Sequence, residues 1–206
     1  MVYTVFCVIH IAVMAGLVIL FCLSLLVPQS VAKNSLIILL VSIFITITGM
    51  YLELTMSETV SSALVALKIE YIGLFMMMLS LMHFVSIMAN FRINIIFYII
   101  VYVVMAVCII ALFSTSPIEG ENHGLFYRSM EIISEGAYKR IEVKSGIGWI
   151  VIYSVIAIEF VVLIICTTIA ALKANPIQQR RIRLVLFGLL FVVFELILKG
   201  VFKVLF

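Results

Sequence analysis

Long runs of apolar residues dominate the chain, and most polar residues are confined to the segments between them. Six runs reach the roughly 18 residues that a helix needs to cross the hydrocarbon of a membrane. The pattern therefore predicts an all-α transmembrane protein, a single-domain bundle of six membrane-spanning helices. The predicted spans are residues 5–27, 36–54, 69–89, 95–113, 147–172 and 184–206.

The longest segment between spans, residues 114–146, has a strand-like pattern in its second half. Apolar and charged residues alternate cleanly over residues 141–144, less cleanly over 126–132, and Ser134-Glu135-Gly136 lies between the two runs. A short turn with glycine between two half-apolar runs is typical of a β-hairpin. We expect a small antiparallel hairpin packed over the helix ends, because an isolated hairpin is only marginally stable. An irregular loop is the alternative.

Composition agrees with a membrane protein. Hydrophobic residues make up 66% of the 206 residues and charged residues 11%, and the mean hydropathy is +1.38. Such a chain has too little polar surface to cover a water-soluble core. We expect a multi-pass protein of the cell membrane whose main partner is membrane lipid, with no nucleic-acid binding.

Basic residues predict the orientation. All ten acidic residues are glutamates, and none lies in the segments that follow spans 1, 3 and 5. Those segments do carry basic residues, and Lys and Arg are retained on the cytoplasmic side of a membrane. They are therefore expected inside, with the N-terminus and residues 114–146 outside. The basic residues are Lys33, Arg92, Lys173, Arg180, Arg181 and Arg183. The segments on the other face also hold basic residues, so the orientation rests on the cluster after span 5; the basic residues of the other face are Lys68, Arg128, Lys139, Arg140 and Lys144.

Six spans that begin outside also end outside, which is unusual for a receptor. The last residues, Val201–Phe206, remain apolar apart from Lys203 and carry no signal that would stop a helix. We expect the natural protein to continue into a seventh helix that returns to the cytoplasm. The alternative is a short protein that ends at the membrane surface.

Ionisable residues inside the spans are candidates for function, because each charge placed in hydrocarbon costs at least about 2.5 kcal/mol and usually faces the bundle interior. Glu159 and Glu195 are predicted near the membrane midplane, and Lys199 follows Glu195 by one helical turn. Glu195 and Lys199 either neutralise each other or form the polar floor of a ligand cavity. Glu159 has no partner in its own helix, so it is expected to be protonated or paired across helices.

Other candidate residues have simpler structural roles. His83 is expected to be a core histidine hydrogen-bonded between helices, with a ligand or proton-relay role as the alternative. Gly49, Gly73 and Gly188 would permit close approach of helices. We find no phosphate-binding glycine loop, no metal-ligand spacing and no paired nucleophile, so no catalytic, cofactor or metal site is predicted.

Several short motifs resemble one known family. The motifs are Leu67-Lys68-Ile69-Glu70-Tyr71-Ile72-Gly73, His123-Gly124-Leu125-Phe126-Tyr127, Ser145-Gly146-Ile147-Gly148-Trp149, Ile152-Tyr153 and Asn175-Pro176-Ile177-Gln178-Gln179-Arg180-Arg181. Together, over spans 2 to 6, they resemble the N-terminal seven-transmembrane sensor region of bacterial histidine kinases, which diguanylate cyclases sometimes also carry. The resemblance implies an outside N-terminus and a seventh helix leading to a cytoplasmic output domain. The chain departs from the pattern at Leu189-Leu190-Phe191, where a proline is expected.

The favoured function is that of a sensory input domain without catalytic activity of its own. A small molecule or peptide would bind between the helices beneath the hairpin, and a homodimer is possible. The candidate ligand-binding or signalling residues add four near the outer helix ends to those inside the spans: Glu70, Tyr71, Trp149 and Tyr153. The three aromatic residues are expected first as anchors at the membrane interface, with cavity lining as the alternative. The alternative is a small transporter or channel subunit that uses Glu159, Glu195 and Lys199.

Overall fold

Six helices and one small sheet make up the described part of the computed structural model, which covers residues 2–56, 58–114, 120–121, 125–135 and 138–205. In the last helix the side chains are described up to Leu190. The helices are α1 (Val2–Leu26), α2 (Val31–Met56), α3 (Val60–Met88), α4 (Ile95–Phe113), α5 (Ile147–Lys173) and α6 (Pro176–Leu205). The strands are β1 (Gly120–Glu121), β2 (Tyr127–Glu135) and β3 (Tyr138–Ser145).

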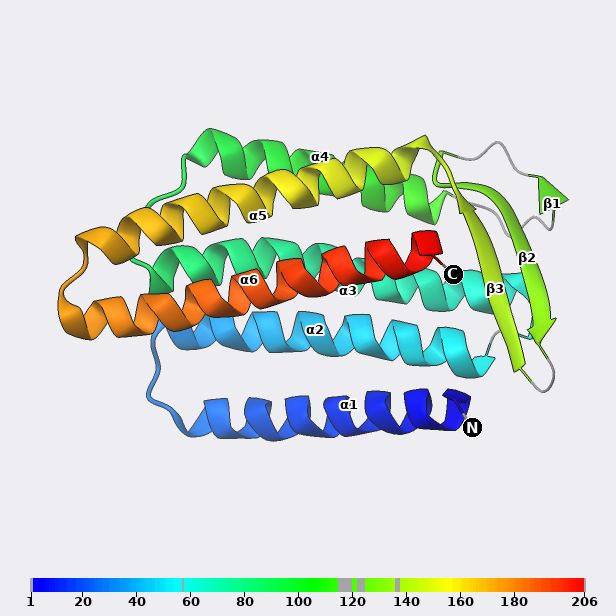
Figure 1. The fold of residues 1–206 in the computed structure, drawn as a ribbon, viewed down its shortest axis with the longest axis horizontal. Helices are drawn as coiled ribbons and strands as arrows, with labels where there is room; N and C mark the ends of the chain where they lie inside the picture. Colours follow the sequence, from blue (N-terminus) through cyan, green and yellow to red (C-terminus); the bar gives the residue numbers. More distant parts are fainter. Residues whose placement is uncertain (1, 57, 115–119, 122–124, 136–137, 206) are drawn as a thin grey trace.

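The helices lie side by side along one long axis, and the two ends of the bundle differ (Figure 1). The sheet lies at one end, where α1 and α3 begin; we call this the sheet end. The connections α1–α2, α3–α4 and α5–α6 lie at the opposite end. We call this the basic end, because those connections and the adjoining helix ends carry the six basic residues named above. The alternation predicted from the basic residues is thus present in the fold.

The predicted six-helix transmembrane fold is confirmed. Each predicted span falls within one helix to within a residue, and α1 to α5 are long and apolar enough to cross a membrane. Some helices start well before their spans because local caps extend them. At the start of α3, Thr59 and Ser62 form a capping box; at the start of α6, the Gln178 backbone N–H donates to Asn175 Oδ1 over 2.9 Å.

Two lysines satisfy helix ends that would otherwise leave carbonyls without donors. Lys33 Nζ donates to Leu25 O at 3.1 Å and Val27 O at 2.7 Å, closing the end of α1, and its side chain is buried. Lys68 Nζ donates to Phe113 O at 3.3 Å at the end of α4. The last carbonyls of a helix attract cations for this reason. Lys33 is therefore a structural cap at the basic end.

Helices α2 and α3 make the closest pair in the bundle. A Cβ atom added at Gly49 would overlap the backbone of Glu70, and one added at Gly73 would overlap the backbone of Thr46. Small residues allow such backbone approach in membranes, as predicted for these two glycines. At Gly188 nothing described lies within 4 Å of an added Cβ, so the part of the chain that the structure describes contains no such approach there.

The interior is built mainly from α3, α4 and α5. Phe75, Met78 and Met82 of α3 pack with Met105 of α4 and Ile152 of α5, all almost fully buried. Many apolar side chains of the same helices are exposed, as expected of surfaces that face lipid tails. Of the helices α1 to α5, α1 is the least buried, and it packs along α2 (Figure 1).

The predicted hairpin is confirmed and is larger than expected. Strands β2 and β3 pair antiparallel from Tyr127 opposite Ser145 to Glu135 opposite Tyr138. Ser134 and Glu135 were predicted in the turn, but both are paired strand residues. A third strand, β1, pairs with β2 at Met130. Two residues are too short a strand for a hydropathy pattern to indicate.

Candidate functional site

A cluster of aromatic side chains joins the sheet to the helices at the sheet end. Trp149, in the first turn of α5, is its centre and is 3% exposed. The Trp149 ring centroid lies 4.3 Å from that of Tyr71 on α3, 5.5 Å from Phe126, 6.0 Å from Tyr127 and 5.8 Å from Tyr153. Tilted and edge-on pairs at such distances are favourable beyond the area that they bury. The Trp149 cluster, as we call these five residues, thus links α3, α5 and the start of β2.

Two backbone hydrogen bonds hold the start of β2 against α5. The Gly146 N–H donates to Phe126 O at 2.7 Å, and the Gly148 N–H donates to Leu125 O at 2.8 Å. A Cβ atom at Gly148 would lie 2.9 Å from Phe126 Cε1, so the ring rests directly on the helix start. Glycine at this position allows the aromatic ring to reach its place beside Trp149.

Four predicted site residues meet here. Glu70 and Tyr71 are half-buried on α3, Trp149 is buried on α5, and Tyr153 is more than half exposed one turn further along α5. Sequence reasoning missed the contribution of Phe126 and Tyr127, which are both 1% exposed. The available signal was an aromatic pair at the start of the less regular alternation over residues 126–132.

Tyr127 brings a buried hydroxyl into the cluster. Its oxygen has no hydrogen-bond partner among the described residues. Burial raises the pKa of Tyr127 above its ordinary value, and the charges of Glu70 and Glu53 raise it further. The two carboxylates on α3 and α2 therefore lie near enough to influence the cluster electrostatically.

Tyr127→Phe is expected to leave stability at pH 7 within about 1 kcal/mol, because it removes a hydroxyl without leaving a partner unsatisfied. In the native protein the folded state keeps this proton above pH 10, whereas the unfolded state loses it near pH 10. The stabilisation by the neutral phenol is therefore present below pH 10 and is lost as pH rises towards the raised pKa. Between pH 7 and pH 11 the free energy of unfolding of the native sequence should therefore fall by about 1.4 kcal/mol more than that of Tyr127→Phe. Unfolding curves at pH 7 and pH 11 measure this difference, and equal pH dependence would contradict it.

Glu159 lies deeper in the bundle, in the middle of α5. Its side chain is fully buried, and neither carboxylate oxygen has a hydrogen-bond partner among the described residues. The expectation that it faces the bundle interior is met. Glu195 and Lys199 fall on α6, but their side chains lie outside the described residues, so their mutual pairing and any pairing with Glu159 stay predictions.

His83 differs from its predicted structural role. Its side chain is exposed on the surface of α3, so it is not a core histidine held between helices. The neighbouring Met82 and Val85 are the buried residues of that turn. Because α3 is apolar on all sides, periodicity could not indicate which of these residues faced inward.

A cavity of about 530 Å³ opens at the sheet end between the end of α2 and the start of α3. It has a size that suits small ligands. Ala66 in its wall precedes Glu70 by one turn of α3. The lining residues are Leu52, Thr55, Glu58, Thr59, Ser62, Val65 and Ala66.

Comparison with known families assigns the chain to one of them. The family model described as the N-terminal 7TM region of histidine kinase matches residues 5–204, nearly the whole chain. The chain belongs to this family. Searches of curated proteins and of solved structures found no match.

The structure of this histidine kinase 7TM region agrees with its membership of the family. Such a region is a membrane-spanning, non-catalytic sensory input domain, and the apolar helices α1 to α5 fit that role. Within the described residues no group of three His, Cys, Asp or Glu side chains could hold a metal ion. The described features that bear on a sensory role are the Trp149 cluster, the cavity beside α2 and α3, and the buried Glu159.

Proposed function

We propose that this domain detects an extracellular or membrane-derived small molecule or peptide at the sheet end and relays a change in helix packing to a cytoplasmic output domain. The observation that supports this proposal most directly is the Trp149 cluster, in which the sheet, α3 and α5 meet through one buried side chain. A ligand that binds one packing of this cluster better than another would shift the equilibrium between them.

The cavity between α2 and α3 is the proposed entry point for the ligand. Its wall contains polar side chains from the α2–α3 connection and apolar side chains from both helices, a mixture that suits an amphipathic ligand. Glu70 lies one turn further along α3 and is next to Tyr71 of the cluster. Filling the cavity would thus act on the same helix that carries the Tyr71 ring.

Helices α3 and α5 supply the route to the other end. Both run without interruption from the Trp149 cluster to the basic end (Figure 1). Helix α5 has 27 residues, so it spans about 40 Å at 1.5 Å per residue. A tilt or rotation of α5 at Trp149 would therefore move the residues around Lys173.

The proposed orientation places the sheet end outside and the basic end in the cytoplasm. It is supported by the six basic residues at one end and by the retention of Lys and Arg on the cytoplasmic side. The N-terminus of α1 would then be outside, together with the sheet (Figure 1).

The relay can be tested with Cys166, which lines a cavity at the basic end. In a chain whose other cysteines are replaced by alanine, Trp149→Phe should change the alkylation rate of Cys166 about fivefold, the lower range of coupling between distant sites. The rate is measured with a maleimide in liposomes. The cysteines to be replaced are Cys7, Cys22 and Cys108.

Val151→Ala is the matched control, because Val151 lies on the same helix and is 47% exposed. It should leave the alkylation rate of Cys166 unchanged. Equal rates in the native, Trp149→Phe and Val151→Ala proteins would show that the cluster is not coupled to the basic end, and the relay would be abandoned.

A further inference from the structure

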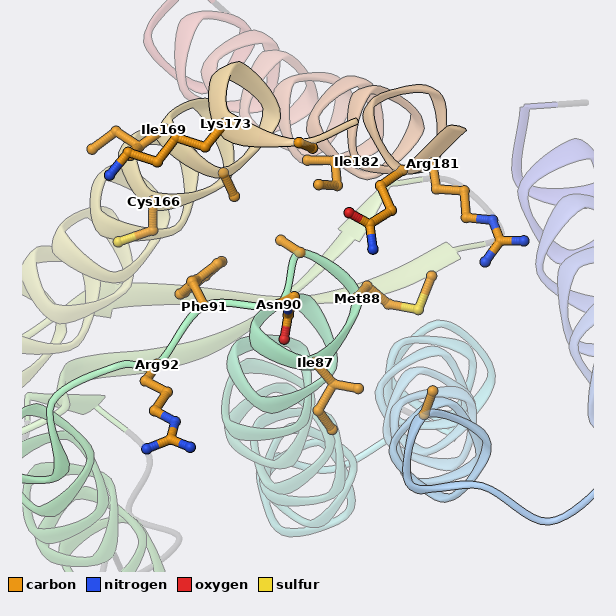
Figure 2. A pocket seen from close by; sticks show the side chains of 15 residues that line it. Ile87, Met88, Asn90, Phe91, Arg92, Cys166, Ile169, Lys173, Arg181 and Ile182 are labelled. Carbon is orange, nitrogen blue, oxygen red and sulfur yellow. The ribbon is translucent and has the colours of Figure 1, made fainter. Parts of the chain in front are cut away.

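A second cavity, of about 610 Å³, lies at the basic end, with most of its lining from the end of α3, the α3–α4 connection, α5 and α6 (Figure 2). The α3–α4 connection contributes Asn90, Phe91 and Arg92, α5 contributes residues up to Lys173, and α6 contributes Gln178, Arg181 and Ile182. Ala89 and Ile182 of its lining belong to a small apolar cluster in which they are buried together with Ala171. The cavity thus rests on a packed junction of α3, α5 and α6.

Three cations line this cavity, and none of them has a neutralising partner in the part of the chain that the structure describes. Figure 2 shows Arg92, Lys173 and Arg181 on three sides of it, each from a different element, with the charged ends of the side chains extending outward at its rim. None of them makes a hydrogen bond or ion pair with another described residue, and all three are exposed. The three connections at the basic end contain no glutamate. The rim of the cavity therefore carries positive charge that no described side chain neutralises.

The backbone around the cavity also favours an anionic ligand. Helix α3 ends at Met88, and two residues later the φ of 53° at Asn90 turns the chain so that Arg92 lies at the rim. Helix α6 begins beside the cavity, with Gln178 in its first turn among the lining residues. The amino end of a helix carries a partial positive charge and attracts anions.

The walls that face the bundle are apolar and continue into the lipid-facing surface. Ile87 of α3 and Ile169 of α5 line the cavity, and Ile169 is 46% exposed. On α5 the surface continues through Ile165, which is 53% exposed. A ligand with a charged head and an apolar tail could place its head among the cations and its tail along α5.

We propose that this cavity binds the phosphate headgroup of an anionic glycerophospholipid. Arg and Lys bind phosphate oxygens by charge-assisted hydrogen bonds, and basic pockets between membrane helices suit anionic headgroups. A free phosphate would use the cations alone, whereas a lipid also uses the apolar surface of Ile165 and Ile169. Because the headgroup would touch the α3–α4 connection, α5 and α6 at once, it would stabilise their junction at the end of the proposed relay.

Lipid binding to the purified chain tests the proposal by native mass spectrometry in a non-ionic detergent. Short-chain phosphatidylglycerol should bind, and short-chain phosphatidylcholine should bind much more weakly. The double variant K173Q/R181Q should weaken phosphatidylglycerol binding about 30-fold, from about one kcal/mol per lost cation. The variant K173R/R181K keeps both charges and should retain binding.

The matched control is R180Q/R183Q, which removes two charges from the same segment at positions that do not line the cavity. It should weaken binding less than about threefold, because only the diffuse field changes. Equal weakening by the two double variants, or equal binding of the two lipids, would overturn the proposal. Displacement of phosphatidylglycerol by millimolar inorganic phosphate would assign the cavity to a free anion instead.

Discussion

Replacing Gly49 with alanine is expected to destabilise the protein by about 3 kcal/mol or more, the upper range for overpacking. The added Cβ would overlap backbone atoms of Glu70, which cannot turn aside as a flexible side chain could. Helices α2 and α3 would have to separate, and with them the residues around Glu70 and Tyr71. Unfolding in mixed micelles of dodecyl maltoside and SDS, followed by circular dichroism, measures the effect.

Gly188→Ala is the control for this prediction. The same atom is added in another helix, but no described atom lies within 4 Å of it. Alanine also has the higher helix propensity, so stability should be unchanged or rise by up to about 1 kcal/mol. Similar unfolding curves for Gly49→Ala and Gly188→Ala would contradict the close packing of α2 on α3.

Trp149→Ala should cost about 3–5 kcal/mol, the usual range for removing a large buried aromatic side chain. Trp149 is 3% exposed and contacts rings from α3, α5 and the start of β2, so its loss leaves a cavity where these elements meet. The sheet should also separate more readily from the bundle. Trypsin should therefore cleave more quickly after the basic residues of β3, Lys139, Arg140 and Lys144.

The neighbouring Ile150→Ala serves as the control, since Ile150 is 66% exposed on the same turn of α5. Its side chain is placed towards lipid, so truncation should change stability by less than about 0.5 kcal/mol. If Trp149→Ala unfolds and is cleaved like Ile150→Ala, the cluster does not hold the sheet to the helices.

The helices were readily predicted from sequence because crossing a membrane requires a length of apolar residues that little else requires. The helix starts at Val60 and Pro176 were not predicted, since they depend on caps at Thr59 and Asn175 that lie outside the apolar runs. The hairpin was found through its alternation near Ile141. Its short third strand carries no such pattern.

The inward faces of the helices could not be predicted in the same way. In water an apolar side chain indicates the core, but in a membrane apolar residues face both the core and the lipid. His83 was therefore placed inside although it is exposed. Glu159 was placed correctly, because a carboxylate is too costly to face hydrocarbon.

The candidate site was predicted in part. Glu70, Tyr71, Trp149 and Tyr153 were noted near the outer ends of their spans, but their meeting depends on how α3 and α5 pack. Phe126 and Tyr127 join them only because the sheet folds back on α5. The basic residues of the second cavity had been used to orient the chain, and only the packing of α5 and α6 against the α3–α4 connection gathers three of them around one space.

The position of Trp149 has a practical consequence for experiments on this receptor domain. It is the only tryptophan in the chain, and it lies where the sheet meets two helices. Its emission wavelength and its quenching by acrylamide report on a single buried indole, without any attached dye. The domain thus contains its own optical probe at the place where ligand binding is proposed to begin.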